Sequence, residues 1–160
     1  MNTGAALTTA GVDGLFAALG DRVRLRIACC LLSAPPPPLS PGGLCVCELV
    51  DALREPQPNV SRHLKLLQGA GLVTERREGR WIYHELTDSN HPLLRSLRTC
   101  LDTVRSCRDV QEDLNGLRRR VALRENGKCV VGTTRIRGGG DRRQKGGGGS
   151  SYTSRGLGSP

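Results

Sequence analysis

The chain of 160 residues has room for one domain and a tail, and its formal net charge is +9. Residues 116–145 hold ten basic and two acidic side chains, or +8 of that total, so the rest of the chain is nearly neutral and its charge alone does not predict a polyanion partner. No apolar run approaches the roughly 20 residues that a membrane helix needs, which excludes a spanning role. Residues 1–14 lack the pattern of a secretory signal, so we expect a cytoplasmic protein without membrane contact.

Apolar residues recur at helical spacing through the first part of the chain. After a small and polar N-terminus at residues 1–11, which we expect to be flexible, the pattern predicts a helix from Val12 to Leu19. Asp21 is a suitable N-cap for a second helix that reaches Leu32. Residues 33–43 contain four consecutive prolines and two glycines, so this stretch is expected to be an exposed connection without regular structure.

Two more helices and a hairpin are expected next. Residues 44–53 have the pattern of a short helix, and after a tight connection another helix has Pro58 in its first turn and stops at Gly69. The apolar period then changes from 3.6 to 2, which predicts strands over residues 72–76 and 81–86. Two short helices followed at once by a hairpin indicate a winged helix-turn-helix with a two-stranded wing, a mainly α (α+β) fold.

A long C-terminal helix is expected after Pro92, with Asn115-Gly116 as the place most able to break it. The apolar faces of this helix and of the first helix have no obvious partner within the chain, which predicts a homodimer. The DNA-binding and dimerisation domain would therefore span residues 12–125. Residues 126–160 are basic and glycine-rich and are expected to form a disordered tail.

The seven cysteines indicate thiol chemistry, because an odd count without a secretory signal argues against a disulfide framework. Cys29 and Cys30 lie among apolar residues of the second helix, where packing in the core is the simpler interpretation. Cys45 and Cys47 form a Cys-x-Cys pair at the start of the third helix, where the helix dipole favours a thiolate. Thiolates without clustered histidines or carboxylates suit soft ions and disfavour calcium, magnesium and manganese.

The spacing of the cysteines predicts how they would meet an ion. Positions i and i+2 of an ideal helix point about 200° apart, so Cys45 and Cys47 reach one small ion only if that helical turn unwinds. We expect this distortion to tilt the following helix and cause release from DNA. Cys100 and Cys107 share a helix face but lie roughly 10 Å apart along the axis. They are either further ligands that join thiols of a second subunit, or small side chains packed in the dimer interface.

The helix that begins near Pro58 presents a polar face that is expected to enter the major groove of double-stranded DNA. With Val60 and Leu64 pointing inward, five residues project toward base edges or phosphates: Gln57, Asn59, Ser61, Arg62 and Lys65. His63 lies nearer the inward edge and is expected to pack against the core. Three arginines around the hairpin turn are suited to phosphates or the minor groove: Arg76, Arg77 and Arg80.

Several stretches of the chain carry a family resemblance. Residues 44–49 read Leu-Cys-Val-Cys-Glu-Leu, and residues 57–64 read Gln-Pro-Asn-Val-Ser-Arg-His-Leu. They resemble the metal box and the recognition helix of the ArsR-type (ArsR/SmtB) arsenic-responsive winged-helix repressors, and residues 19–25 and 71–83 are similar to the flanking helix and the wing. The resemblance implies a homodimeric transcriptional repressor that leaves its operator DNA when arsenic(III) or antimony(III) binds cysteine thiolates, without an organic cofactor.

Two features leave the sensed signal open. Some relatives have a third cysteine three residues after the second, where this chain has Val50, and zinc-sensing relatives use histidines on the last helix, which this chain lacks after Pro92. The same fold could serve as a cadmium or lead sensor, or as a thiol-redox sensor with disulfides between subunits. An enzyme is not expected, because the Cys-x-Cys pair has no nearby histidine base and no glycine-rich phosphate loop follows a strand.

Overall fold

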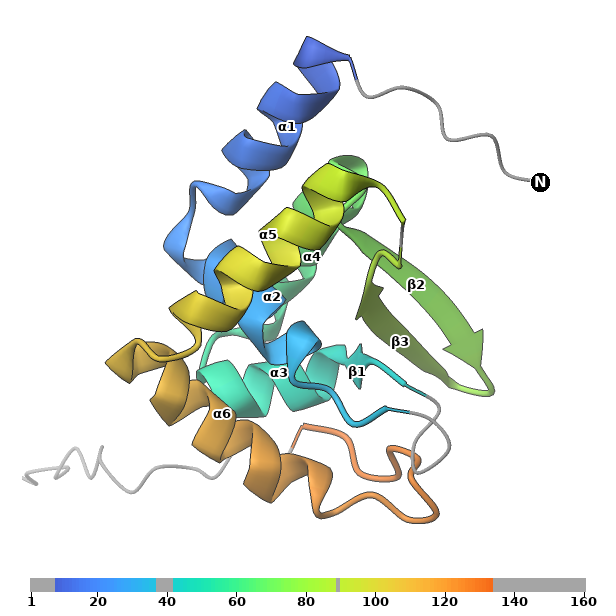
Figure 1. Cartoon of the computed structure of the whole chain (residues 1–160). Helices are drawn as coiled ribbons and strands as arrows, with labels where there is room; N and C mark the ends of the chain where they lie inside the picture. The colour runs from blue at the N-terminus through green and yellow to red at the C-terminus, as the bar shows by residue number, and fades with distance from the viewer. Residues whose placement is uncertain (1–7, 37–41, 89, 134–160) are drawn as a thin grey trace, which may run out of the picture.

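The computed structural model describes residues 8–36, 42–88 and 90–133. Within these ranges the chain forms six helices and a small antiparallel sheet of three strands (Figure 1). The elements in chain order are α1 (Thr9–Leu19), α2 (Arg22–Leu32), β1 (Leu44–Cys45), α3 (Val46–Leu53), α4 (Gln57–Gly69), β2 (Val73–Glu78), β3 (Trp81–Leu86), α5 (Pro92–Val104) and α6 (Arg108–Val121).

Helix α2 is the centre of the core and packs against each of the other five helices and against β3. Its N-terminus is capped as predicted, because the Asp21 carboxylate accepts a hydrogen bond of 3.0 Å from the backbone N–H of Arg24. Its inner face is completely buried and includes Ile27, Cys29 and Cys30. The expectation that these two cysteines are small core side chains is therefore confirmed.

Helices α3 and α4 and the β2–β3 hairpin form the predicted winged helix-turn-helix. The wing differs from the prediction by a third strand, because β1 pairs with β3 in the order β1-β3-β2. Residues 44–53 are therefore a short strand followed by a helix, and not one helix. Gly42 and Gly43 turn the chain onto β3 with φ of 83° and 69°, values that glycine adopts without steric strain.

The expectation of one long C-terminal helix is wrong. The chain breaks at residues 105–107, so that α5 and α6 are separate helices, and Asn115-Gly116 lies inside α6 without breaking it. A Cβ atom at Gly116 would lie 3.0 Å from the carbonyl oxygen of Ala52, so glycine lets α6 approach α3 closely. The apolar face of this region is expected from the sequence to have no partner within the chain, but four of its residues pack in the core: Leu97, Leu101, Val110 and Leu114.

The predicted domain limits also differ from the structure at both ends. Thr9–Gly11, expected to be flexible, are the first residues of α1, while residues 1–7 lie outside the described part. Residues 126–133, assigned to the tail, follow α6 and turn back beneath α3 and β1 (Figure 1), and they include the buried Cys129. Residues 134–160 lie outside the described part. No described helix has the length and apolar character required to cross a membrane.

Gly43 is the position where the fold should be most sensitive to a small substitution. Its φ is positive, and a Cβ atom would lie 2.6 Å from both Glu85 Cγ and the carbonyl oxygen of His84. We expect Gly43→Ala to lower the free energy of unfolding by roughly 2 kcal/mol or more, as measured by urea denaturation.

Gly14→Ala is the matched control, because a Cβ atom at this helical position would meet nothing within 4 Å. It should leave the stability unchanged or raise it by about 0.5–1 kcal/mol. Equal effects of the two substitutions would contradict the close approach of Gly43 to β3.

Candidate functional site

Three cysteine thiols converge in the interior below the sheet. The sulfur atoms of Cys45, Cys47 and Cys129 all lie within 4.8 Å of one another, and Cys47 Sγ is 3.6 Å from Cys129 Sγ. All three side chains are buried. In the described ranges, no other group of three or more cysteine, histidine or acidic side chains has this spacing. The arrangement provides the soft donor set that thiophilic ions prefer.

The convergence of Cys45 and Cys47 corrects the geometric argument from sequence. Cys45 is not in a helical turn: it pairs with Tyr83 at the end of β1 and is the N-cap of α3, with an extended backbone (φ −78°, ψ 157°). Cys47 lies in the first turn of α3. Because the two residues are not on one regular helix, their sulfurs approach each other without any unwinding of α3.

Cys129 reaches the site because the segment after α6 is anchored at several points. Its backbone N–H donates a hydrogen bond of 2.9 Å to the hydroxyl of Tyr83, which is itself buried. Arg124, at the start of the segment, donates to the carbonyl oxygen of Gly43 and, through two nitrogens, to the carboxylate of Glu48. From the sequence, Cys129 is assigned to the tail of residues 126–160 and is expected to have no more than an accessory role. Its one signal there is that no other cysteine lies near it in the chain.

The guanidinium of Arg120 lies next to two of the sulfurs. Its Nη2 is 3.6 Å from Cys47 Sγ and 3.8 Å from Cys129 Sγ. Its Nε donates to Asp51 Oδ2 at 2.7 Å, and Nη2 also donates to the carbonyl oxygens of Val131 and Gly132. Arg120 thus joins α6, α3 and the C-terminal segment around the thiols.

The three thiols differ in acidity. A hydrogen bond from the Cys45 thiol, with further help from Cys129 and from the charge of Arg120, lowers the pKa of Cys47 to about 6. The same hydrogen bond and burial raise the pKa of Cys45 well above that of an ordinary thiol. Burial, together with the negative charge of Glu48, raises the pKa of Cys129 to about 11. Cys47 is therefore the thiolate, and hence the nucleophile, of the cluster.

The other predicted thiol ligands lie apart from one another. The expectation that Cys100 and Cys107 share one helix face is wrong, because Cys100 is in α5, whereas Cys107 is the N-cap of α6. Both side chains are exposed. The structure therefore leaves open both sequence hypotheses for this pair, which concern contacts between subunits.

Helix α4 presents most of the predicted DNA-contacting side chains at the surface. Gln57, Arg62 and Lys65 are exposed, while Asn59 and Ser61 are half-buried. The Asn59 side chain accepts a hydrogen bond of 2.9 Å from Arg62 and donates one of 3.0 Å to Glu55. These contacts connect the side chains of the first turn of α4 to each other and to Glu55, which precedes the helix. His63 is buried as expected, with Nδ1 3.7 Å from Asp21 Oδ1.

The wing arginines are not equivalent. Arg77 and Arg80 are exposed near the hairpin turn, and Arg80 lies over the ring of Trp81 at 5.3 Å. Arg76 is half-buried, with ion pairs of 2.9 Å to both Glu78 and Glu85. The charge of Arg76 is neutralised by these two carboxylates of the sheet. Arg77 and Arg80 are therefore better suited than Arg76 to bind a phosphate.

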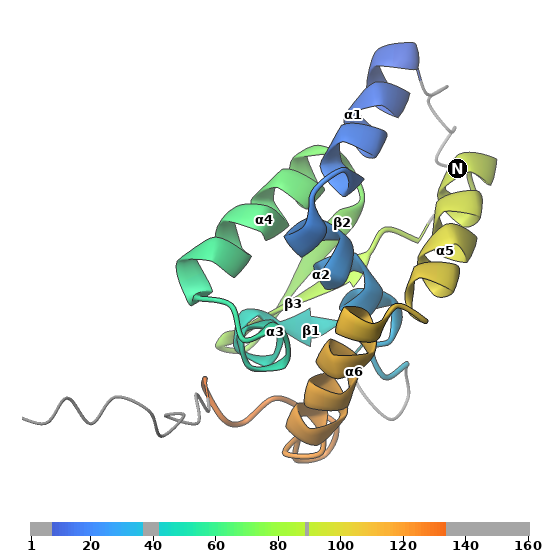
Figure 2. The same ribbon diagram turned by 90° about the vertical axis from the view of Figure 1, so that its left-hand side faces the viewer.

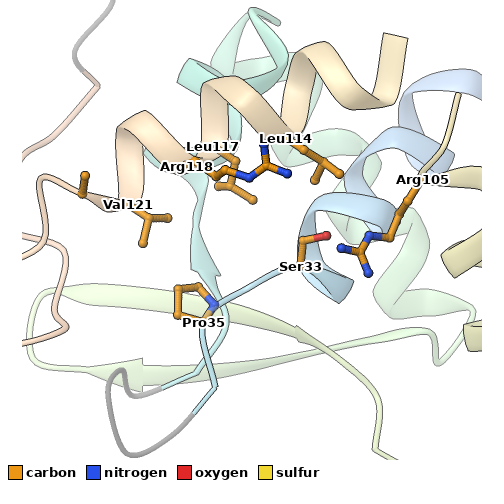
Figure 3. Close-up of a pocket in the computed structure, with 8 residues that line it drawn as sticks. Ser33, Pro35, Arg105, Leu114, Leu117, Arg118 and Val121 are labelled. Atoms are coloured by element: carbon orange, nitrogen blue, oxygen red, sulfur yellow. The ribbon is translucent and has the colours of Figure 1, made fainter. Parts of the chain in front are cut away.

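A separate pocket of about 410 Å³ lies between the C-terminal end of α2 and α6 (Figure 3). Most of its lining residues are apolar, and the side chains of Arg105 and Arg118 also line it. None of the predicted site residues lines it, so the thiol cluster and the α4–wing surface remain the candidate functional sites. The lining residues are Ser33, Pro35, Arg105, Leu114, Leu117, Arg118, Val121 and Ala122.

The known proteins that this chain resembles in sequence include several transcriptional regulators. An HTH-type transcriptional regulator of Methanocaldococcus jannaschii is 39% identical over 74 residues, which are 46% of this chain and 75% of the relative. Arsenical resistance operon repressors are 41% identical over 73 residues in Escherichia coli and 35% identical over 85 residues in Bacillus subtilis. These matches cover 46% and 53% of this chain, and 56% and 74% of the two repressors.

Among solved structures, reduced HlyU from Vibrio cholerae is 25% identical with a TM-score of 0.48, covering 62% of this chain and 93% of that one. Residues 38–75 match the family described as bacterial regulatory protein, arsR family. These residues include β1, Cys45, Cys47 and the helix-turn-helix. The family match agrees with relatives that exceed 30% identity over about three quarters of their own length. The chain therefore belongs to the ArsR family of bacterial transcriptional regulators, which are not enzymes.

Proposed function

We propose that this protein is a repressor that binds operator DNA as a homodimer and releases it when trivalent arsenic or antimony binds Cys45, Cys47 and Cys129. The convergence of three buried thiols within 4.8 Å is the observation that supports the proposal. It supplies the third sulfur that the Cys-x-Cys motif lacks, and three sulfurs are the donor set that these trivalent ions prefer. Two of the relatives are named as arsenical resistance operon repressors, which supports arsenic as the inducer.

The thiols are suited to exchange with arsenous acid, As(OH)₃. Three As–O bonds break and three As–S bonds form, while the hydroxyl groups and three protons leave as three molecules of water. Cys47 attacks first, because its low pKa makes it the thiolate of the cluster. The protons of the Cys45 and Cys129 thiols convert two of the displaced hydroxides to water. The hydroxide that the Cys47 thiolate displaces takes its proton from solvent. The product is electrically neutral.

Ion binding would act on the DNA-reading parts through the elements that hold the sulfurs. Cys47 lies in α3, which packs against α4, and Cys45 lies in β1, which pairs with the wing strand β3. Cys129 is joined to the same strand through Tyr83, and Lys128 forms an ion pair of 2.7 Å with Glu78 in β2. Drawing the sulfurs together would therefore change the spacing between α4 and the wing. This displacement replaces the unwinding of α3 as our mechanism of induction.

The homodimer is supported by α1, which projects at one end of the molecule in both views (Figures 1 and 2). It leaves Phe16, the chain's one phenylalanine, 55% exposed. A second copy of the chain would cover this side chain and would present two α4 helices to the two halves of a pseudo-palindromic operator. We assign DNA contact to the polar face of α4, which comprises Gln57, Asn59, Ser61, Arg62 and Lys65. The wing arginines are also assigned to DNA contact, and we expect Arg77 and Arg80 to contribute more than Arg76.

A thiol-redox response is the second candidate. The distance of 3.6 Å between Cys47 Sγ and Cys129 Sγ favours a disulfide within one chain over the disulfides between subunits that the sequence suggested. A peroxide would oxidise the Cys47 thiolate to a sulfenic acid with release of hydroxide, and the Cys129 thiol would then displace water to form the disulfide. Release of DNA by peroxide but not by arsenite would favour this candidate.

Removal of Cys129 tests the ligand assignment. Cys129→Ser should bind operator DNA normally, because the side chain is buried and is not among the residues assigned to DNA contact. The arsenite concentration for half-maximal release should rise at least about 100-fold, since loss of a direct ligand exceeds the 10–100-fold effect of outer-sphere partners. Fluorescence anisotropy of a labelled operator fragment measures both quantities.

Cys100→Ser is the matched control, because this thiol is exposed on α5. It should respond to arsenite like the unmodified protein. A Cys129→Ser protein that still responds, together with a Cys100→Ser protein that does not, would move the ligands to α5 and refute the proposed site.

Arg62→Ala tests the role of α4 in reading DNA. Its loss should weaken operator binding by about 1–3 kcal/mol, roughly 5- to 150-fold, if the guanidinium contacts a base edge. Arg108→Ala removes an equal charge from an exposed side chain at the start of α6 and should change the affinity little. Equal losses in the two variants would mean that Arg62 contributes only through general charge.

The acidity of Cys47 predicts a pH-dependent thiolate. Ultraviolet absorbance should show one thiol ionising near pH 6 in the folded protein, with the thiol form below that pH and the thiolate above it. Cys47→Ser should remove this step. Cys129→Ala should shift the step to higher pH, because it removes a hydrogen bond that stabilises the thiolate. If the step persists in Cys47→Ser, another thiol is the nucleophile.

A further inference from the structure

Two ion pairs surround the thiol cluster, and their charges cancel. Arg120 Nε is 2.7 Å from Asp51 Oδ2, and Arg124 Nε is 2.7 Å from Glu48 Oε1. All four side chains are buried, with at most 9% of each exposed. These four described side chains, which we call the charged shell, therefore place two positive and two negative charges next to the sulfurs.

Within this shell, Arg120 is the positive group that touches sulfur, and Asp51 is its acidic partner. The guanidinium contacts the sulfurs of Cys47 and Cys129 at 3.6 and 3.8 Å. An unpaired arginine in this position would favour negative charge on the sulfur cluster. Because Asp51 lies on the same guanidinium, it cancels much of that effect.

The net charge of the ion–thiolate complex depends on the charge of the bound ion. Three thiolates around a trivalent ion form a neutral complex, and displacement of three hydroxides as water leaves no charge behind. Three thiolates around a divalent cation, formed with release of the thiol protons, carry one negative charge. A buried charge without compensation is unfavourable, so the charge of the surrounding shell determines how well each complex is tolerated.

We propose that Asp51, through its pairing with Arg120, is a specificity-determining residue that makes the thiol site discriminate against divalent soft cations in favour of trivalent ones. The inference rests on the proposed function, because it takes Cys45, Cys47 and Cys129 as the ligands. Asp51 touches neither the sulfurs nor an ion. It neutralises the charge of Arg120, so that this arginine stabilises an anionic complex less.

Asp51→Asn tests this role, because it removes the charge and keeps the shape and an oxygen for Arg120. The affinities for cadmium(II) and for arsenite are measured on the full chain by ultraviolet absorbance of the ion–thiolate bonds, with competing chelators. The ratio of cadmium to arsenite affinity should rise at least about tenfold, since one buried negative charge near an anionic complex is gone. The arsenite affinity itself should change much less.

Two further variants separate charge from structure. Glu48→Gln removes the other buried negative charge, keeps an acceptor for the Cys45 N–H and should move the ratio in the same direction. The double variant Asp51→Asn/Arg120→Gln restores a neutral shell and should return the ratio toward that of the unmodified protein. Glu112→Gln, at an exposed position of α6, is the control and should leave the ratio unchanged.

The outcomes distinguish the two proposals. An unchanged ratio in both Asp51→Asn and Glu48→Gln, with both ions still bound through the three thiols, would overturn the specificity role and leave the proposed function intact. Failure of the unmodified protein to bind arsenite would refute the proposed function and the inference with it. A ratio that rises in Asp51→Asn and returns in the double variant would support the role of charge, because a purely structural defect is not repaired by a second substitution.

Discussion

The buried ion pair between Glu48 and Arg124 holds the thiol site together. Glu48 has no exposed surface and accepts hydrogen bonds from the Cys45 N–H and from two nitrogens of Arg124, which also binds the Gly43 carbonyl. One charged pair thus fixes the end of β1, the first turn of α3 and the segment that carries Cys129. Because leaving one partner of such a pair buried alone costs about 3–5 kcal/mol, these three parts are held in one arrangement.

The sheet places that arrangement between the two parts of the protein assigned to DNA contact. Pairing of Cys45 with Tyr83 makes the wing strand β3 one wall of the site, while α3 forms another and packs against α4. A ligand that changes the spacing of the sulfurs therefore acts on the helix-turn-helix and the wing together. Regulation then requires only a small displacement of packed elements, and every helix keeps its hydrogen bonds.

The electrostatics of the site assign different tasks to chemically identical side chains. Hydrogen bonds and the charge of Arg120 lower the pKa of Cys47, whereas burial raises that of Cys129. One thiol is ready to react and another stays protonated until an ion arrives. Asp51 and Glu48 limit how much negative charge the cluster can hold, so the same groups that shape reactivity also bear on which ion is accepted.

The sequence by itself determined the features that depend on local chemistry: the Asp21 cap, the helix that begins near Pro58, the hairpin with its change of apolar period, and the Cys-x-Cys motif. Only the tertiary structure reveals the third thiol ligand, because Cys129 is 82 residues from Cys47 in the sequence and no local pattern connects the two. Likewise, β1 is too short to have a pattern and exists because β3 offers it hydrogen bonds. The close contact of Gly116 with Ala52 also depends on how α6 packs against α3, since it arises between distant residues that no local pattern encodes.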